Sequence, residues 1–113
     1  MKINYVELPA TDLWAMKTFY GTAFGWEFED WGDTYASFTK AGLDGGFIKV
    51  DKAPPTGGTM IILYADDIDA AEAAVHRAGG KITDHVDFPG GKRFHFTDPT
   101  GNELAVWTKA EMV

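Results

Sequence analysis

The sequence predicts one α+β domain that consists of two βαβββ modules, and an internal repeat is the main reason for this prediction. Asp12-Leu13 returns as Asp67-Ile68 about 55 positions later, and small residues behind each pair recur at the same distance. A strand-like run precedes each aspartate, and several short β-like segments follow each expected helix. Two copies of so long a period do not form a solenoid, which needs at least three repeats to bury a continuous core. The repeat therefore indicates a single domain with a cleft between two related halves.

The first module is expected over residues 1–52, and its elements follow from local patterns. Residues 3–9 have the pattern of a strand that ends at Pro9, and Thr11 or Asp12 then caps a helix that runs to about Phe24, before Gly25. Apolar residues recur along this helix at three-to-four spacing and predict its buried face: Leu13, Met16, Phe19, Tyr20, Ala23 and Phe24. Three strands are predicted after it, at residues 26–31, 34–40 and 46–50.

The second module, expected over residues 59–113, repeats this plan after a linker rich in proline and glycine at residues 53–58. A strand is predicted at residues 59–65, and Asp67 is expected to begin a helix that ends near Ala78. The predicted inward residues of this helix are Ile68, Ala71, Ala74 or Val75, and Ala78. Three more strands are predicted at residues 81–88, 93–97 and 103–108, and residues 98–101 have the residue order of a type I turn.

Composition and charge exclude several classes of function. The 113 residues are 45% hydrophobic and 14% aromatic, which suits a packed core and argues against disorder. The net charge is −7 without a basic patch, so neither nucleic acid nor an anionic membrane is expected as a partner. Cysteine is absent, which excludes disulfides and thiolate chemistry. No apolar run of membrane-spanning length and no signal-peptide pattern occurs, so a cytoplasmic location is expected.

Three predicted strands carry different side chains on their two faces, because alternate residues of a strand point in opposite directions. One set is aliphatic and is expected to lie under the helices: Val6 and Leu8, Ile61 and Leu63, Leu104 and Val106. The other set mixes aromatic side chains with carboxylates: Tyr5 and Glu7, Met60, Ile62 and Tyr64, and Glu103, Ala105 and Trp107. A partly apolar concave surface with a few polar groups is typical of small-molecule sites, so a small organic molecule is the expected partner.

Several short motifs, none of them specific alone, form an ordered set along the whole chain. They are Val6-Glu7-Leu8-Pro9, Thr11-Asp12-Leu13, Phe19-Tyr20, Phe24-Gly25-Trp26, Asp66-Asp67-Ile68-Asp69-Ala70-Ala71, Ala78-Gly79-Gly80 and Asp98-Pro99-Thr100-Gly101-Asn102. The set resembles the vicinal oxygen chelate superfamily, which includes glyoxalase I, bleomycin-resistance proteins and extradiol dioxygenases. The resemblance is greatest to its small single-domain, glyoxalase-like members. It implies the paired βαβββ fold, and it implies a homodimer, because members commonly arrange four modules around one axis.

The resemblance also implies where a metal would bind, and the chain departs from the family pattern there. Enzymes of the superfamily hold a divalent metal with His, Gln or Glu side chains on one face of the paired modules. Those positions fall on Tyr5, Met60 and Ala105, with the fourth near Ile48 or Val50. Met60 and Ala105 offer no oxygen or nitrogen ligand, and tyrosine is a rare ligand in such sites. Neither a metal nor another cofactor is therefore expected.

Glu7 is the strongest polar candidate for chemistry, and two roles remain open for it. On the pocket face, desolvation would suit Glu7 to general acid or base catalysis. On the rim it would be solvated, or paired with Lys49 or Arg93. His95 could face the pocket or be structural, and His85 on the neighbouring strand could approach it. The expected ligand-binding residues are Tyr5, Glu7, Met60, Ala105, Trp107 and His95, with Glu7 the one catalytic candidate.

Two functions are compatible with this pattern. The first is a binding protein without a metal, which sequesters or senses a small organic molecule. The alternative is a glyoxalase-type lyase or isomerase that uses a non-standard metal site or Glu7 alone as the base. The mixed aromatic and carboxylate face disfavours a purely structural domain that binds no ligand.

Overall fold

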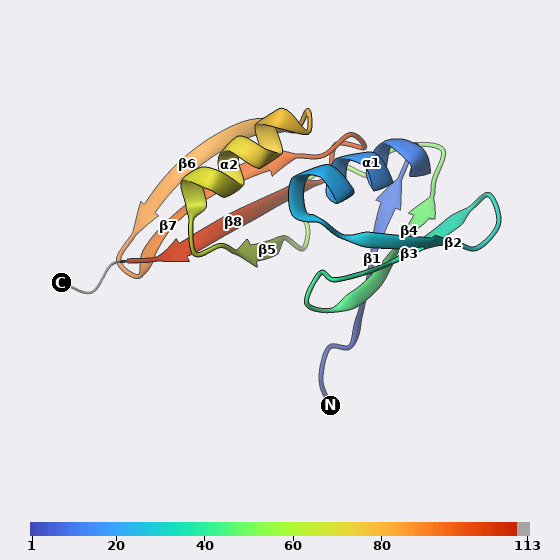
Figure 1. Ribbon diagram of the computed structural model, residues 1–113, viewed down its shortest axis with the longest axis horizontal. Coiled ribbons are helices and arrows are strands. Elements are labelled where there is room, and N and C mark those ends of the chain that lie inside the picture. Colours follow the sequence, from blue (N-terminus) through green and yellow to red (C-terminus); the bar gives the residue numbers. More distant parts are fainter. Residues whose placement is uncertain (111–113) are drawn as a thin grey trace.

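Two four-stranded sheets, one from each half of the chain, form the framework of the molecule (Figure 1). The computed structural model describes residues 1–110, so residues 111–113, the end of the expected second module, lie outside the described residues. The strand order in sheet one is β1 (Tyr5–Ala10), β4 (Asp44–Lys49), β3 (Tyr35–Thr39) and β2 (Glu27–Asp30). The strand order in sheet two is β5 (Ile61–Tyr64), β8 (Glu103–Lys109), β7 (Gly91–Thr97) and β6 (Lys81–Phe88). In each sheet the module's first and last strands pair in parallel and the other neighbours pair antiparallel. The predicted α+β fold of two βαβββ modules is confirmed.

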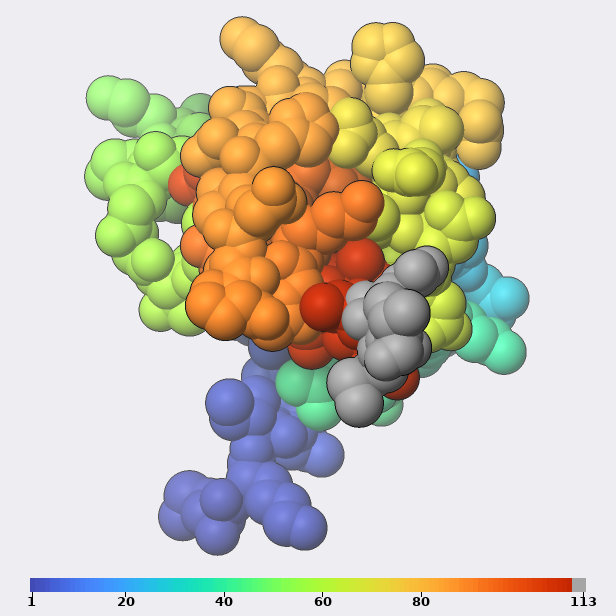
Figure 2. All heavy atoms as spheres, turned by 90° about the vertical axis from the view of Figure 1, so that its left-hand side faces the viewer, coloured from blue at the N-terminus to red at the C-terminus, as the bar shows by residue number. Residues whose placement is uncertain are grey.

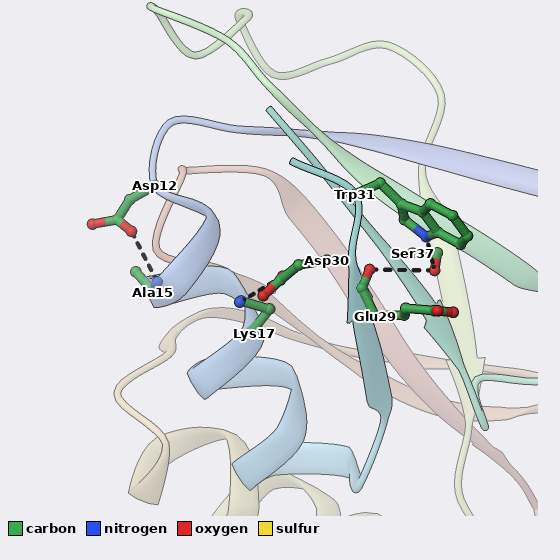
Figure 3. Close-up of polar contacts among 7 residues, drawn as sticks. All are labelled: Asp12, Ala15, Lys17, Glu29, Asp30, Trp31 and Ser37. Atoms are coloured by element: carbon green, nitrogen blue, oxygen red, sulfur yellow. Dashed lines mark hydrogen bonds and ion pairs between the residues drawn. The ribbon is translucent and has the colours of Figure 1, made fainter. Parts of the chain in front are cut away.

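Module one has the five expected elements. They are β1 (Tyr5–Ala10), α1 (Leu13–Phe24), β2 (Glu27–Asp30), β3 (Tyr35–Thr39) and β4 (Asp44–Lys49). Asp12 is the helix cap, since its carboxylate accepts a hydrogen bond from the backbone N–H of Ala15 (Figure 3). Gly25 ends α1 with a φ of 74°, a left-handed conformation that glycine adopts without steric cost. Strand β4 begins two residues earlier than predicted, because Asp44 and Gly45 pair with Tyr5 and Val6 of β1 and do not belong to the preceding turn.

Module two repeats these elements. They are β5 (Ile61–Tyr64), α2 (Ile68–Arg77), β6 (Lys81–Phe88), β7 (Gly91–Thr97) and β8 (Glu103–Lys109). Asp67 caps α2 by accepting a hydrogen bond from the backbone N–H of Ala70, which gives this acidic residue a structural role. Of the two alternatives for the inward position, Val75 is fully buried and Ala74 is only partly buried.

The two helices lie side by side and cover one face of both sheets (Figure 1). Beneath α1 the core is aromatic: the Tyr20 ring stacks on Trp26 with centroids 4.6 Å apart, and Trp26 stacks on Phe38 at 4.7 Å. Every member of the aliphatic set predicted to lie under the helices belongs to this core or packs against it. Neither helix in residues 1–110 is long and apolar enough to cross a membrane.

The turn between β7 and β8 is buried against module one. Asp98 accepts hydrogen bonds through Oδ1 from three backbone N–H groups of its own turn, those of Thr100, Gly101 and Asn102. The Tyr20 hydroxyl of α1 donates to Asp98 Oδ2 at 2.9 Å. Burial raises the pKa of the Asp98 carboxyl, and burial next to Asp98 raises the pKa of the Tyr20 phenol. The turn therefore connects the cores of both modules through one buried carboxyl group.

Two further hydrogen bonds join this turn to the junction between β1 and α1. The Thr100 hydroxyl accepts from the backbone N–H of Thr11, and the Asn102 amide donates to the backbone carbonyl of Pro9. These contacts link residues from opposite ends of the chain. They hold β1 close to β8, and this proximity creates the site.

Candidate functional site

A cleft of about 420 Å³ lies between the two modules. Strand β1 borders it on one side, β5 and β8 border it on the other, and the linker residues 54–59 complete its wall. Figure 2 shows the light-green linker as an arm at the edge of the molecule, with a hollow between it and the body. Two carboxylates, Glu7 and Glu103, line the cleft together with Met60 and the polar side chains of Thr56, Thr59 and Asn102. Most of the other walls are apolar: Val6, Leu8, Pro9, Pro54, Pro55, Ile61 and Leu104.

Glu7 belongs to a hydrogen-bonded chain on the open face of sheet one, which is the face opposite α1. The Tyr35 hydroxyl donates to Glu7 Oε2 at 3.0 Å, and the hydroxyl oxygens of Tyr5 and Tyr35 lie 2.6 Å apart. Desolvation, helped by these hydrogen bonds, raises the pKa of the Tyr35 phenol far above its usual range. Tyr35 therefore remains a proton donor that orients Glu7. Glu7 takes part in none of the ion pairs of residues 1–110.

Gly46 makes this arrangement possible. A Cβ atom at position 46 would lie 2.2 Å from the Tyr35 hydroxyl oxygen and 2.4 Å from the adjacent ring carbon. The Tyr35 ring thus occupies the space above Gly46 and reaches Glu7 on the edge strand. Sequence reasoning did not identify Tyr35. Two consecutive glycines inside a strand were the available signal, because such glycines often mark a close approach of another group.

Glu103 has an equivalent partner on the open face of sheet two, opposite α2. His95 Nδ1 lies 3.2 Å from Glu103 Oε2. His95 is only 8% exposed, and its Nε2 has no hydrogen-bond partner within residues 1–110. His85 faces the other way and contacts Glu72 of α2 at 2.8 Å, so the two strand histidines do not approach one another.

Not all of the expected ligand-binding residues meet in the cleft. Glu7 and Met60 line it directly. Tyr5 is connected to Glu7 through Tyr35, and His95 is connected to the lining residue Glu103. Ala105 is fully buried opposite His95 in the strand pairing, and the cleft does not reach it.

Trp107 lies further along β8, outside the lining of the cleft. Its ring packs edge-on against Tyr64 with centroids 4.9 Å apart and lies 6.3 Å from the ring of Phe88. These three aromatic side chains form a separate apolar cluster on module two. A ligand that contacts Trp107 would therefore occupy a different place from one that contacts Glu7.

The family resemblance left the fourth metal-ligand position near Ile48 or Val50, and strand pairing favours Gly46 for it. Gly46 pairs with Glu7 as Ala105 pairs with Ile62, so Gly46 is the module-one counterpart of Ala105. The four positions are then occupied by Tyr5, Gly46, Met60 and Ala105. These residues do not fit a divalent metal that needs oxygen and nitrogen ligands. Within residues 1–110, no three His, Asp or Glu side chains come together as a possible metal site.

Comparisons with known proteins agree with this fold. The model of the Glyoxalase/Bleomycin resistance protein/Dioxygenase superfamily matches residues 2–106. The chain is 32% identical, over 92% of its length, to "Putative glyoxylase CFP32" of Mycobacterium bovis, and it spans only 44% of that protein.

Two solved structures have the same fold. The fosfomycin resistance protein FosX of Listeria monocytogenes has a TM-score of 0.84 at 16% identity, covering 97% of this chain and 94% of that one. The antibiotic binding protein TnmS3 of Streptomyces sp. CB03234 has a TM-score of 0.73 at 23% identity, covering 97% of each chain. At these identities the two structures establish the fold alone.

Proposed function

Because the chain belongs to the glyoxalase/bleomycin resistance protein/dioxygenase superfamily, we propose that it binds a small organic molecule in the cleft between its modules, without a metal ion. One observation carries the proposal: an otherwise largely apolar cleft contains two carboxylates, each hydrogen-bonded to another side chain of its own sheet. The cleft volume lies within the range of roughly 300–1,000 Å³ that is usual for small-molecule sites. Side chains that are already oriented lose less conformational freedom when a ligand binds.

The relatives are compatible with binding and do not require catalysis. TnmS3 is an antibiotic binding protein, so this fold is used for binding a small organic molecule. The mycobacterial relative bears the name of an enzyme, but the chain corresponds to less than half of it. One fold supports many functions, and the site residues must decide between them. The residues at the family's metal positions favour binding over a metal-dependent reaction.

The proposal includes a homodimer. Apolar side chains of the two open faces are between 38% and 46% exposed, namely Tyr5, Ile48, Ile62 and Tyr64. A second copy would cover such surfaces, and closed two-fold dimers are the commonest soluble assembly. Light scattering should give about twice the chain mass of 12.4 kDa. A monomer mass across micromolar concentrations would contradict the dimer.

Substitution of Glu7 tests the binding site. A thermal-shift screen of small organic molecules identifies a ligand, and the affinity of that ligand is then measured for Glu7→Gln. The amide keeps the shape of the carboxylate and removes its charge, so binding of a cationic or hydrogen-bond-donating ligand should weaken by about 1–3 kcal/mol. Glu29→Gln is the matched control, since Glu29 is an exposed carboxylate on β2 of the same sheet. Equal affinities for wild type and Glu7→Gln would show that the carboxylate of Glu7 does not contribute to ligand binding.

Tryptophan fluorescence separates the cleft from the aromatic cluster of module two. A ligand in the cleft should leave the emission of Trp107 nearly unchanged, with Trp107→Phe as the reference for the other tryptophans. A strong change in the emission of Trp107 would indicate that the ligand binds on the open face of sheet two instead of in the cleft.

Elemental analysis tests the absence of a metal. Protein purified without a chelator should contain well under one Ni, Zn, Mn or Fe per chain, because the family's ligand positions lack suitable donors. One tightly held metal ion per chain would refute this part of the proposal.

A further inference from the structure

The charges that line the cleft have one sign. Glu7 and Glu103 are its charged side chains, and none of the Lys, Arg or His residues in the described part of the chain lines it. The protein as a whole also carries a net charge of −7. We infer that the cleft selects an organic cation, such as an ammonium or guanidinium group on an apolar frame. This inference rests on the proposed function and specifies the class of its ligand.

The neighbours of the two carboxylates leave their charge available. The partner of Glu7 is the uncharged phenol of Tyr35, which donates to Oε2 only. The partner of Glu103 is His95, which contacts Oε2 only. Oε1 of both residues makes no hydrogen bond within residues 1–110. Even a protonated His95 would balance only Glu103, so Glu7 would still make the cleft negative.

The apolar walls of the cleft indicate what the uncharged part of the ligand is. Pro54 and Pro55 have no backbone N–H, and the aliphatic side chains of Leu8 and Ile61 offer no hydrogen bonds. A ligand that fills this space displaces water from the carboxylates. A neutral ligand replaces that lost hydration only with weaker hydrogen bonds, an anion adds repulsion, and a cation replaces the water with charge-assisted hydrogen bonds. The apolar frame of the ligand would contact the aliphatic walls.

Three probes that share one frame test the inference. They are 3-phenylpropan-1-amine, 3-phenylpropan-1-ol and 3-phenylpropanoate, which differ only in the charge of their polar end. Dissociation constants are measured by NMR titration of the full chain, from the backbone amide shifts of the cleft residues. The amine should bind about tenfold or more tightly than the alcohol, as expected for a charge-assisted hydrogen bond. The propanoate should bind more weakly than the alcohol, and added salt should reduce the advantage of the amine.

Two charge-neutralising variants locate the selectivity. Glu7→Gln and Glu103→Gln should each lower the affinity for the amine several-fold and change the affinity for the alcohol much less. Glu29→Gln, on the same sheet but outside the cleft, should leave both affinities unchanged. Urea unfolding of each variant, with retention of the alcohol's affinity, shows that the fold and the cleft remain intact.

The outcomes separate this inference from the proposed function. If the alcohol or the propanoate binds in the cleft as tightly as the amine, the preference for a cation is wrong and the binding cleft remains. If none of the three probes shifts the cleft residues, the inference is overturned. If the thermal-shift screen then also yields no molecule that binds in the cleft, the proposed function falls with it.

Discussion

Helix α1 of module one buries Met16, Phe19 and Tyr20, whereas helix α2 of module two buries only Ile68 and Val75. Aromatic rings stack beneath α1, and the smaller aliphatic side chains of α2 fill the same place over sheet two. Both modules nevertheless have the same strand order. Helix caps, turns and the alternation of apolar and polar residues therefore set the topology, while the core tolerates different side chains of suitable total volume.

One side-chain contact joins each helix to the outer strand of its sheet, and it lies at equivalent positions in the two modules. Lys17 of α1 pairs with Asp30 of β2 at 2.7 Å (Figure 3). Glu72 of α2 contacts His85 of β6 at 2.8 Å. Glu72 stands 55 positions after Lys17, and His85 stands 55 positions after Asp30. The positions of the pair are therefore equivalent in the two modules, but the helix carries the basic residue in module one and the acidic residue in module two.

The open faces differ in a way that shapes the site. In module one the acid is on β1, where Glu7 pairs with Gly46 and accepts a hydrogen bond from Tyr35. In module two the position equivalent to Glu7 is Ile62, and the acid is on β8 as Glu103. The cleft therefore receives one carboxylate from each module, although the repeat does not place them at equivalent positions.

The largest expected effect concerns the two corresponding turns. Asp98→Ala should lower the free energy of unfolding by about 3–5 kcal/mol, since it leaves several buried donors without an acceptor. In module one the corresponding turn contains Lys40, which is exposed, and Lys40→Ala should change stability by at most about 0.5 kcal/mol. Urea unfolding measures both. A loss below about 1 kcal/mol for Asp98→Ala would mean that this turn does not hold the modules together.

The next effect tests why position 46 is glycine and its counterpart, position 105, is alanine. Gly46→Ala should cost about 1–3 kcal/mol, because its methyl group would overlap the Tyr35 ring and overpack the face. The same substitution in a Tyr35→Ala background should cost much less, since the space above position 46 is then free. Denaturant unfolding of the four proteins gives the coupling energy. Equal costs in both backgrounds would show that another contact excludes the methyl group.

A pH-dependent effect distinguishes the buried junction from the rest of the molecule. Burial raises the pKa of the Tyr20 phenol above its unfolded value, so the folded protein keeps this proton where the unfolded chain loses it. The stability of wild type relative to Tyr20→Phe should be constant from neutral pH to about pH 10 and then fall by about 1.4 kcal/mol per pH unit until the folded pKa is reached. Unfolding free energies measured over an alkaline pH series test this. A constant difference between the two proteins would contradict it.

The smallest effect is expected for the two equivalent contacts between helix and outer strand, Lys17 with Asp30 and Glu72 with His85. Lys17→Ala and Glu72→Ala should each cost less than about 1 kcal/mol, because partly exposed ion pairs gain little against solvent screening. Added salt should reduce the small cost of Lys17→Ala further. Thermal unfolding at low and high salt tests both variants. A cost of several kcal/mol would show that one module depends on its pair far more than the other.

The sequence predicted the elements whose signals are local. Asp67 caps α2 because its side-chain oxygen accepts a hydrogen bond from a backbone N–H three residues later. Gly25 ends α1 because glycine adopts the left-handed backbone conformation that closes a helix. The division of β1 into a core face and an open face followed from alternation alone. The fold class and the positions of Glu7 and Met60 near the intermodule cleft required nothing beyond these signals and the repeat.

Tertiary structure decided the partners in the site. Tyr35 reaches Glu7 only because β3 lies two strands away from β1 across Gly46, and Glu103 meets His95 only through the register of β7 and β8. The contact between Tyr20 and Asp98 joins residues 78 positions apart. Local sequence patterns specify backbone conformation over a few residues, whereas these contacts depend on how sheets, helices and the linker pack together. The sequence alone was therefore enough to predict the fold class, whereas the cleft and the orientation of its two carboxylates depend on the packing of the whole molecule.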